Sequence, residues 1–153
     1  MATSSRSRVA RFALAALAAL AFAAAIHWAQ RAPEGPVSVP LDRVACAHCG
    51  MLVSEAAFSG QLHTRNGDVL FYDDPGCLLL DAEQRGEDVR AHWFHDAGSE
   101  RWLSAEEVGF APADPTPMGY GLAAHPRAEG LLDRERALEL ARARDAARRG
   151  AQP

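Results

Sequence analysis

The segment VACAHCGMLV, residues 44–53, concentrates residue types that bind metals or take part in thiol chemistry. Cys46 and Cys49 are three residues apart, His48 lies between them, and Met51 follows the second cysteine by two residues. A thiolate and a thioether are soft, polarisable donors, which select Cu(I) over divalent ions that prefer imidazole and carboxylate. Because a thioether is rare in structural zinc sites, Met51 favours monovalent copper.

Other interpretations of the same segment stay open at this point. Cys46 and Cys49 fit a disulfide in an oxidising compartment, which would leave one of the three cysteines of the chain unpaired. They also fit a redox-active pair, whose reactivity depends on a lowered thiol pKa, or a zinc site. Met51 fits a core position before Leu52 and Val53. Gly50 removes side-chain bulk between the second cysteine and the methionine and permits a tight loop.

The N-terminal segment has the features of an export signal. Three arginines precede an uncharged apolar run, residues 12–30. Ala21-Phe22-Ala23 offers a small-x-small cleavage site, whereas the run is nearly long enough to span a bilayer. By the positive-inside rule, the arginines stay in the cytoplasm, and the chain after Arg31 lies on the opposite side of the membrane. We therefore expect a bacterial periplasmic protein, anchored in the inner membrane by residues 1–30 unless this segment is cleaved as a signal peptide. Composition alone leaves a mitochondrial location as the alternative.

The charge balance argues against a nucleic-acid partner. The 153-residue chain has a formal net charge of −4, and without residues 1–23 this becomes −7, because 13 arginines then face 20 acidic residues. Neutralising phosphates requires a basic face, which such a chain lacks.

Turn residues and apolar runs predict the secondary-structure elements that position the candidate metal-binding segment, residues 44–53. Residues 31–43 contain three prolines and a glycine and are expected to form a linker before a domain that starts near Val44. Arg65-Asn66-Gly67 between two apolar-rich runs predicts a β-hairpin. Pro75 at an entry position and Gly86 at an exit predict a helix of about three turns.

The second half of the chain predicts another hairpin and a final helix. Trp93 and Trp102 are expected to be sheet residues on either side of a turn at 97–99. Residues 129–153 predict an Arg-rich amphipathic helix and tail, with Asp133 as the helix cap. The expected fold class is α+β: a small domain with a mostly antiparallel sheet, β-hairpins and packed helices, preceded by a hydrophobic leader helix.

Three motifs in this order, CAHCGM, FSGQLHTRNGDVLFYDDPGC and TPMGYGLAAH, resemble the NosL family of copper-binding accessory proteins, which are linked to assembly of nitrous oxide reductase. The likeness covers residues 44–127. It implies a NosL-like copper-binding domain over residues 44–128. It also implies an exported, membrane-associated Cu(I) carrier, not an enzyme, that passes copper to the maturation machinery of a copper enzyme or to that enzyme.

The resemblance also implies a ligand set. Cys49 and Met51 fall on the CGM element, the copper-associated motif of the family, and Cys46 occupies its first cysteine position. Met118 lies in TPMGYG, where glycines on either side of Tyr120 leave the backbone pliable and the thioether free to approach the first loop. The predicted metal site is therefore Cys46, Cys49, Met51 and Met118, with His48 as a further candidate.

Residues next to the expected helix receive structural roles. Asp73 and Asp74 match the family's acidic turn and are expected to cap the helix that begins at Pro75. Cys77 is expected to be a buried small hydrophobe on that helix, as a single cysteine among leucines usually is. Many family members carry a lipidated cysteine directly after the signal run, whereas no cysteine precedes Cys46 here. Attachment is therefore expected to come from an uncleaved leader helix or not to occur at all.

Two other functions compete with the copper carrier. One is a periplasmic thiol-disulfide oxidoreductase that uses Cys46 and Cys49, and the other is a zinc-stapled interaction module. Against the oxidoreductase, the sequence lacks a recognisable thioredoxin-like βαβ lead-in. Gly50-Met51 is also a poor start for the helix that such a thiol pair needs.

Overall fold

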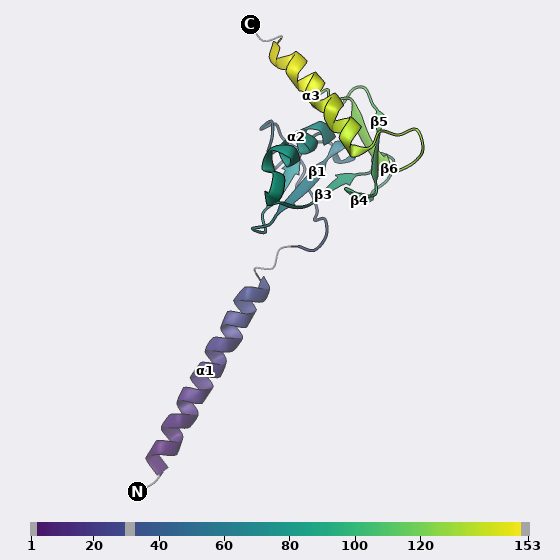
Figure 1. The fold of residues 1–153 in the computed structure, drawn as a ribbon. Coiled ribbons are helices and arrows are strands. Elements are labelled where there is room, and N and C mark those ends of the chain that lie inside the picture. The colour runs from purple at the N-terminus through teal and green to yellow at the C-terminus, as the bar shows by residue number, and fades with distance from the viewer. Residues whose placement is uncertain (1–2, 30–32, 151–153) are drawn as a thin grey trace. The chain divides into compact units, whose positions relative to one another are not determined.

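The computed structural model describes residues 3–29 and 33–150, and the chain divides into two compact units at Ala32 and Pro33 (Figure 1). The first unit contains a single helix in its described part, α1 (Thr3–Ala29). The second unit holds all the other described helices and strands.

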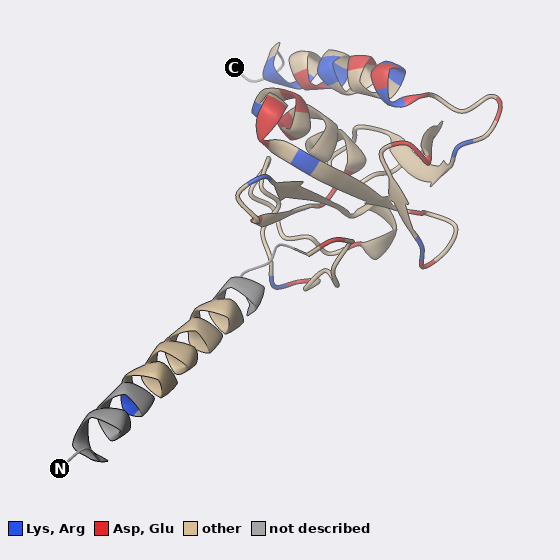
Figure 2. Cartoon of the chain, turned by 60° about the horizontal axis from the view of Figure 1, so that its bottom comes forward, with Lys and Arg blue, Asp and Glu red and all other residues tan. Residues whose placement is uncertain are grey.

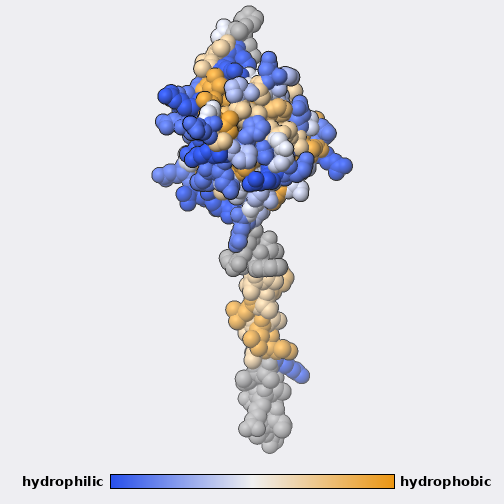
Figure 3. All heavy atoms as spheres, turned by 90° about the vertical axis from the view of Figure 1, so that its right-hand side faces the viewer, coloured by the Kyte–Doolittle hydropathy of each residue, from blue (hydrophilic) through white to orange (hydrophobic). Residues whose placement is uncertain are grey.

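Apolar side chains are exposed along α1 (Figure 3). Alanine has the highest intrinsic helix propensity, and the many alanines of this segment favour a helix of 27 residues without support from packing. Its large exposed apolar residues are Phe12, Leu14, Leu17, Leu20, Phe22 and Ile26. Within the described ranges, no helix combines the length and the apolar character needed to cross a membrane. Anchoring by residues 1–30 stays a prediction.

A four-stranded antiparallel sheet in the order β2-β1-β3-β4 forms the centre of the second unit. Strands β1 (Gly60–Thr64) and β2 (Val69–Tyr72) form the hairpin expected around Asn66-Gly67. Gly67 has a φ of 96°, a backbone conformation that glycine adopts without strain. β3 (Val89–His95) pairs with β1 and with β4 (Trp102–Ser104), which confirms the second hairpin.

A separate two-stranded sheet follows in the chain. It consists of β5 (Val108–Pro112) and β6 (Leu122–Pro126), paired antiparallel. The T-shaped contact of Phe94 with Phe110, at 5.1 Å between ring centroids, joins the two sheets. The described part of the chain therefore has the α+β architecture with antiparallel sheets that the sequence predicted.

Two helices pack on these sheets. α2 (Pro75–Arg85) ends at Gly86, as expected, and short 3₁₀ turns lie at Ala56–Phe58 (η1) and Gly86–Asp88 (η2). α3 (Arg134–Gly150) is preceded by Asp133, whose Oδ1 accepts a hydrogen bond from the backbone N–H of Arg136 at 2.9 Å. Acidic and basic residues alternate along α3 (Figure 2), whereas Ala137 and Ala141 are buried.

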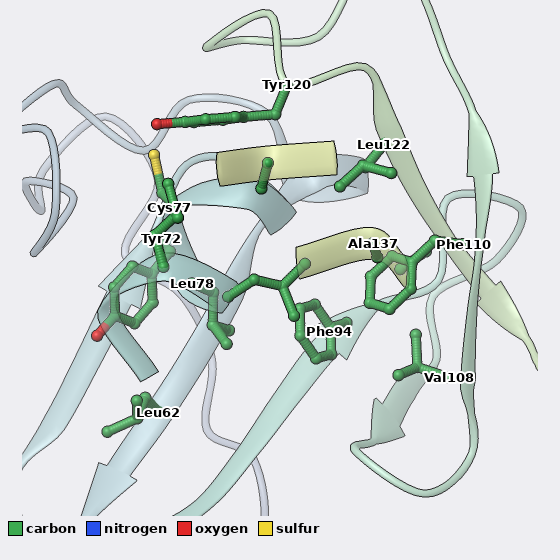
Figure 4. Packing of buried hydrophobic residues seen from close by; sticks show 14 of the residues in the cluster. Leu62, Tyr72, Cys77, Leu78, Phe94, Val108, Phe110, Tyr120, Leu122 and Ala137 are labelled. Atoms are coloured by element: carbon green, nitrogen blue, oxygen red, sulfur yellow. The ribbon is translucent and has the colours of Figure 1, made fainter. Parts of the chain in front are cut away.

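The core lies between the sheets and the two helices (Figure 4). Its largest fully buried apolar side chains come from every layer: Leu62, Tyr72, Leu78, Phe94, Leu103, Phe110, Tyr120 and Leu122. Burial of such side chains is worth about 1.5–3 kcal/mol each, so this cluster fixes the position of α2 against the strands.

The described part of segment 31–43, expected to be a linker, is packed against the sheet. The side-chain amide of Gln61 accepts a hydrogen bond from the N–H of Val37 at 2.8 Å and donates one to its carbonyl at 2.9 Å. Gln61 is fully buried, so these bonds satisfy an amide that water cannot reach. The compact unit therefore begins at Pro33, before the Val44 boundary that the prolines suggested.

Candidate metal centre

Residues 46–51 form a tight turn. The N–H of Cys46 donates to the carbonyl of Met51 at 2.7 Å, and the N–H of Gly50 donates back to the carbonyl of Cys46 at 2.9 Å. Gly50 has a φ of 77°, in the left-handed region that side-chain-bearing residues rarely adopt. The glycine therefore allows the chain to reverse between the second cysteine and the methionine.

Three cysteine side chains meet at this turn. The Sγ atoms of Cys46, Cys49 and Cys77 lie within 4.8 Å of one another. Cys46 and Cys77 are buried, whereas Cys49 is partly exposed. The N–H of Ala47 donates to the carbonyl of Phe71 at 2.9 Å, which ties the turn to the end of β2 from which α2 starts. The group is therefore closed on its inner side and open at one thiol.

The start of α2 fixes Cys77 in this group. Asp74 is the N-cap, and its Oδ1 accepts from the N–H of Gly76 at 2.8 Å. Pro75 occupies the first turn, where its missing N–H costs no hydrogen bond. The expected capping role is thus confirmed for Asp74. Asp73 instead accepts a hydrogen bond from the N–H of Ser54 at 3.1 Å.

Hydrogen bonds lower the pKa of one of the three thiols, that of Cys46. The Cys77 thiol lies in hydrogen-bonding contact with Cys46 and is the main cause that lowers the pKa of Cys46 to about 5, against the opposing effect of burial. Backbone N–H groups of Cys49, Asp73 and His48 add to this effect. The same contact and burial raise the pKa of Cys77, and burial raises that of Cys49. These shifts favour the thiolate form at Cys46 and the protonated form at Cys49 and Cys77.

The other predicted ligands lie on the turn itself, Met51 and His48, and on the loop before β6, Met118. Met51 is 58% exposed, at the outer edge of the turn. Met118 is partly buried and packs against the same apolar cluster as Cys49. Its N–H donates to Asp74 Oδ2 at 3.0 Å, which ties its loop to the start of α2. His48 is partly exposed and lies outside the thiol group. Ligand roles for both methionines stay predictions.

Cys77 was missed as a member of the group. The sequence pattern predicted a buried core residue, and Cys77 is fully buried, but its sulfur also faces the two cysteines of the turn. A signal was present, because a helix that begins at Pro75 places Cys77 in its first turn. The proximity of that turn to residues 46–51 depends on the tertiary structure.

The chain resembles a known protein in its fold and not at a detectable level in its sequence family. No family model matches the sequence, and no curated protein matches it at a significant level. The chain contains a small α+β domain in which one thiol at the start of α2 meets two thiols of a turn. The crystal structure of the copper chaperone NosL from Shewanella denitrificans is similar to this chain, with a TM-score of 0.51 and 16% sequence identity over 73% of this chain and 89% of that chain. The predicted resemblance to NosL is therefore confirmed at the level of the fold.

Proposed function

We propose that this protein is a Cu(I) chaperone that holds its cargo at the group formed by Cys46, Cys49 and Cys77. The observation that carries the proposal is the meeting of three thiol sulfurs within 4.8 Å of one another. Thiolates are soft ligands that favour Cu(I), and a fold shared with a copper chaperone supports the same cargo.

The state of the thiols suits uptake of a monovalent cation. The lowered pKa of Cys46 favours its thiolate, and Cu(I) binding to further thiols displaces protons from Cys77, from Cys49 or from both. Met51 at the outer edge and Met118 on the adjoining loop are the thioethers that could complete the ligand set. A low coordination number leaves room for a partner's ligand to attack from the side of Cys49.

The donor set fits zinc less well. Structural zinc sites are closed by four nitrogen or sulfur ligands. In the part of the chain that the structure describes, the group comprises three cysteines and no His, Asp or Glu. A zinc-stapled module would therefore lack its fourth ligand within this group.

One observation favours a thiol-disulfide oxidoreductase, namely the lowered pKa of Cys46 in a Cys-x-x-Cys sequence. Thiol-disulfide exchange requires a thiolate that can reach the disulfide sulfur of a substrate. Cys46 is only 3% exposed, and the accessible Cys49 has a raised pKa. The reactive form and the accessible position thus belong to different cysteines, which favours the copper carrier.

The setting of the chaperone follows from its sequence. We place it in the bacterial periplasm, with residues 1–30 as leader or inner-membrane anchor. Its recipient is the maturation machinery of a copper enzyme such as nitrous oxide reductase, or that enzyme itself. Transfer proceeds by ligand exchange, in which a soft ligand of the recipient enters beside Cys49 and the carrier's thiols leave in turn.

An anaerobic Cu(I) titration of the reduced chain against a competing chelator tests the proposal. Wild type should bind one ion tightly, and Cys46→Ser, Cys49→Ser and Cys77→Ser should each weaken binding while circular dichroism stays unchanged. Met51→Leu alters an exposed side chain, where substitutions rarely change stability by more than about 0.5 kcal/mol, so an affinity loss there indicates a lost ligand. Equal affinity in wild type and all three serine variants would refute the site. Tighter binding of zinc than of Cu(I) would favour the zinc module.

A further inference from the structure

Residues 116–121, here named the cover loop, form a compact turn between β5 and β6. The carbonyl of Thr116 accepts from the N–H of Gly119 at 2.9 Å, and its hydroxyl accepts from the N–H of Gly121 at 3.1 Å. Both glycines have a positive φ, at 64° and 66°. These bonds give the loop a defined shape of its own.

The cover loop lies against the start of α2. Asp74 caps the helix with one carboxylate oxygen and accepts from the N–H of Met118 with the other at 3.0 Å. A methyl group at Gly76 would lie 2.2 Å from Cγ of Tyr120, so the ring rests directly on the helix backbone. The hydroxyl end of Tyr120 lies beside Cys77 (Figure 4). The loop therefore covers the buried side of the thiol group.

α3 holds the same loop from another direction. Arg148 Nη1 donates to the carbonyl of Met118, and its Cζ lies 4.0 Å from the ring centroid of Tyr120. The Tyr120 hydroxyl donates to Asp145 Oδ1 at 3.4 Å. Met118 is thus held at its N–H by α2 and at its carbonyl by α3.

We propose that Arg148 is a positioning residue of the metal site: it keeps the cover loop closed over the inner side of the thiols and thereby slows the exchange of Cu(I). The inference rests on the proposed function, because it takes the cargo to be bound at the three cysteines. Loss of one charged hydrogen bond and one cation–π contact should favour loop opening roughly tenfold or more.

The first part of the test uses the reduced, metal-free full chain. Arg148→Gln should increase hydrogen exchange at the Met118 amide and alkylation of the Cys77 thiol by iodoacetamide about tenfold. Arg142→Gln is the matched control, since it removes an ion pair between α3 and Glu83 of α2 without touching the loop. Unchanged hydrogen exchange and alkylation rates in Arg148→Gln would overturn the proposal, whatever the Cu(I) affinity of the chain.

The second part measures the rate at which Cu(I) passes from the loaded chain to a chromogenic chelator. Arg148→Gln should transfer copper about tenfold faster than wild type and Arg142→Gln. A loop that opens without faster transfer would overturn its link to metal release. If wild type binds no copper but the metal-free readouts change as expected, the proposed function fails while the positioning of the loop by Arg148 stands.

A second variant controls for the case in which Arg148→Gln acts by unfolding the end of α3. Thr116→Val removes the hydroxyl that accepts from Gly121 and leaves α3 untouched. It should also speed exchange at the Met118 amide and copper transfer. No change of either rate in this variant would mean that the loop does not gate the site.

Discussion

Replacing Cys77 by alanine should raise the pKa of Cys46. The Cys77 thiol is the main cause that lowers this pKa to about 5. A hydrogen bond to a charged group is worth about 1.5–3 kcal/mol, and one pKa unit corresponds to about 1.4 kcal/mol. Loss of the bond should therefore move the pKa of Cys46 to roughly 6–7, because the backbone N–H groups still face its sulfur.

The assay is a pH titration of thiolate absorbance in the reduced, metal-free chain, read with circular dichroism to check folding. Cys77→Ser keeps a donor at this position and should leave the pKa of Cys46 near its wild-type value. If Cys77→Ala, folded, titrates as wild type does, Cys77 does not contact Cys46 and the three-thiol group is wrong.

Three further predictions concern stability and location. Burial lowers the pKa of His92 to about 4, whereas an unfolded histidine titrates near 6.5, so only the unfolded chain takes up this proton as pH falls between these values. As the pH falls through this window, denaturation curves should show that the free energy of unfolding of wild type drops by up to about 3 kcal/mol more than that of His92→Gln. Equal drops in the two proteins would contradict a lowered pKa of His92. Gly76→Ala should cost about 1–3 kcal/mol in the same assay, because the methyl group would overlap the Tyr120 ring; a neutral change would mean that the ring can move away. Residues 1–43 fused to a reporter active only outside the cytoplasm should give activity, and a silent reporter would refute export.

Much of the fold was predictable because its signals are local. Asn66-Gly67 specifies a hairpin through the backbone conformations it tolerates, and Pro75 with Gly86 marks the two ends of α2. The pairing of β5 with β6 has no such signal, since these strands are connected by a long segment without a two-residue turn.

The candidate site was predictable in part, for the same reason. Cys46 and Cys49 are close in sequence, and Gly50 closes the turn between them and the methionine. Cys77 joins them only because the end of β2 delivers α2 to the turn. The hydrogen bonds of Val37 with Gln61 had no signal in the sequence, because prolines indicate the absence of a helix and do not indicate the absence of packing.

Because Cys77 is separated from the turn by a whole hairpin, the three-thiol group exists only in the folded chain. An ion that binds the folded state alone stabilises it in proportion to the logarithm of its concentration over its Kd. On the proposed function, a chain loaded with its ion is therefore more stable than an empty one, and release of the ion lowers its free energy of unfolding.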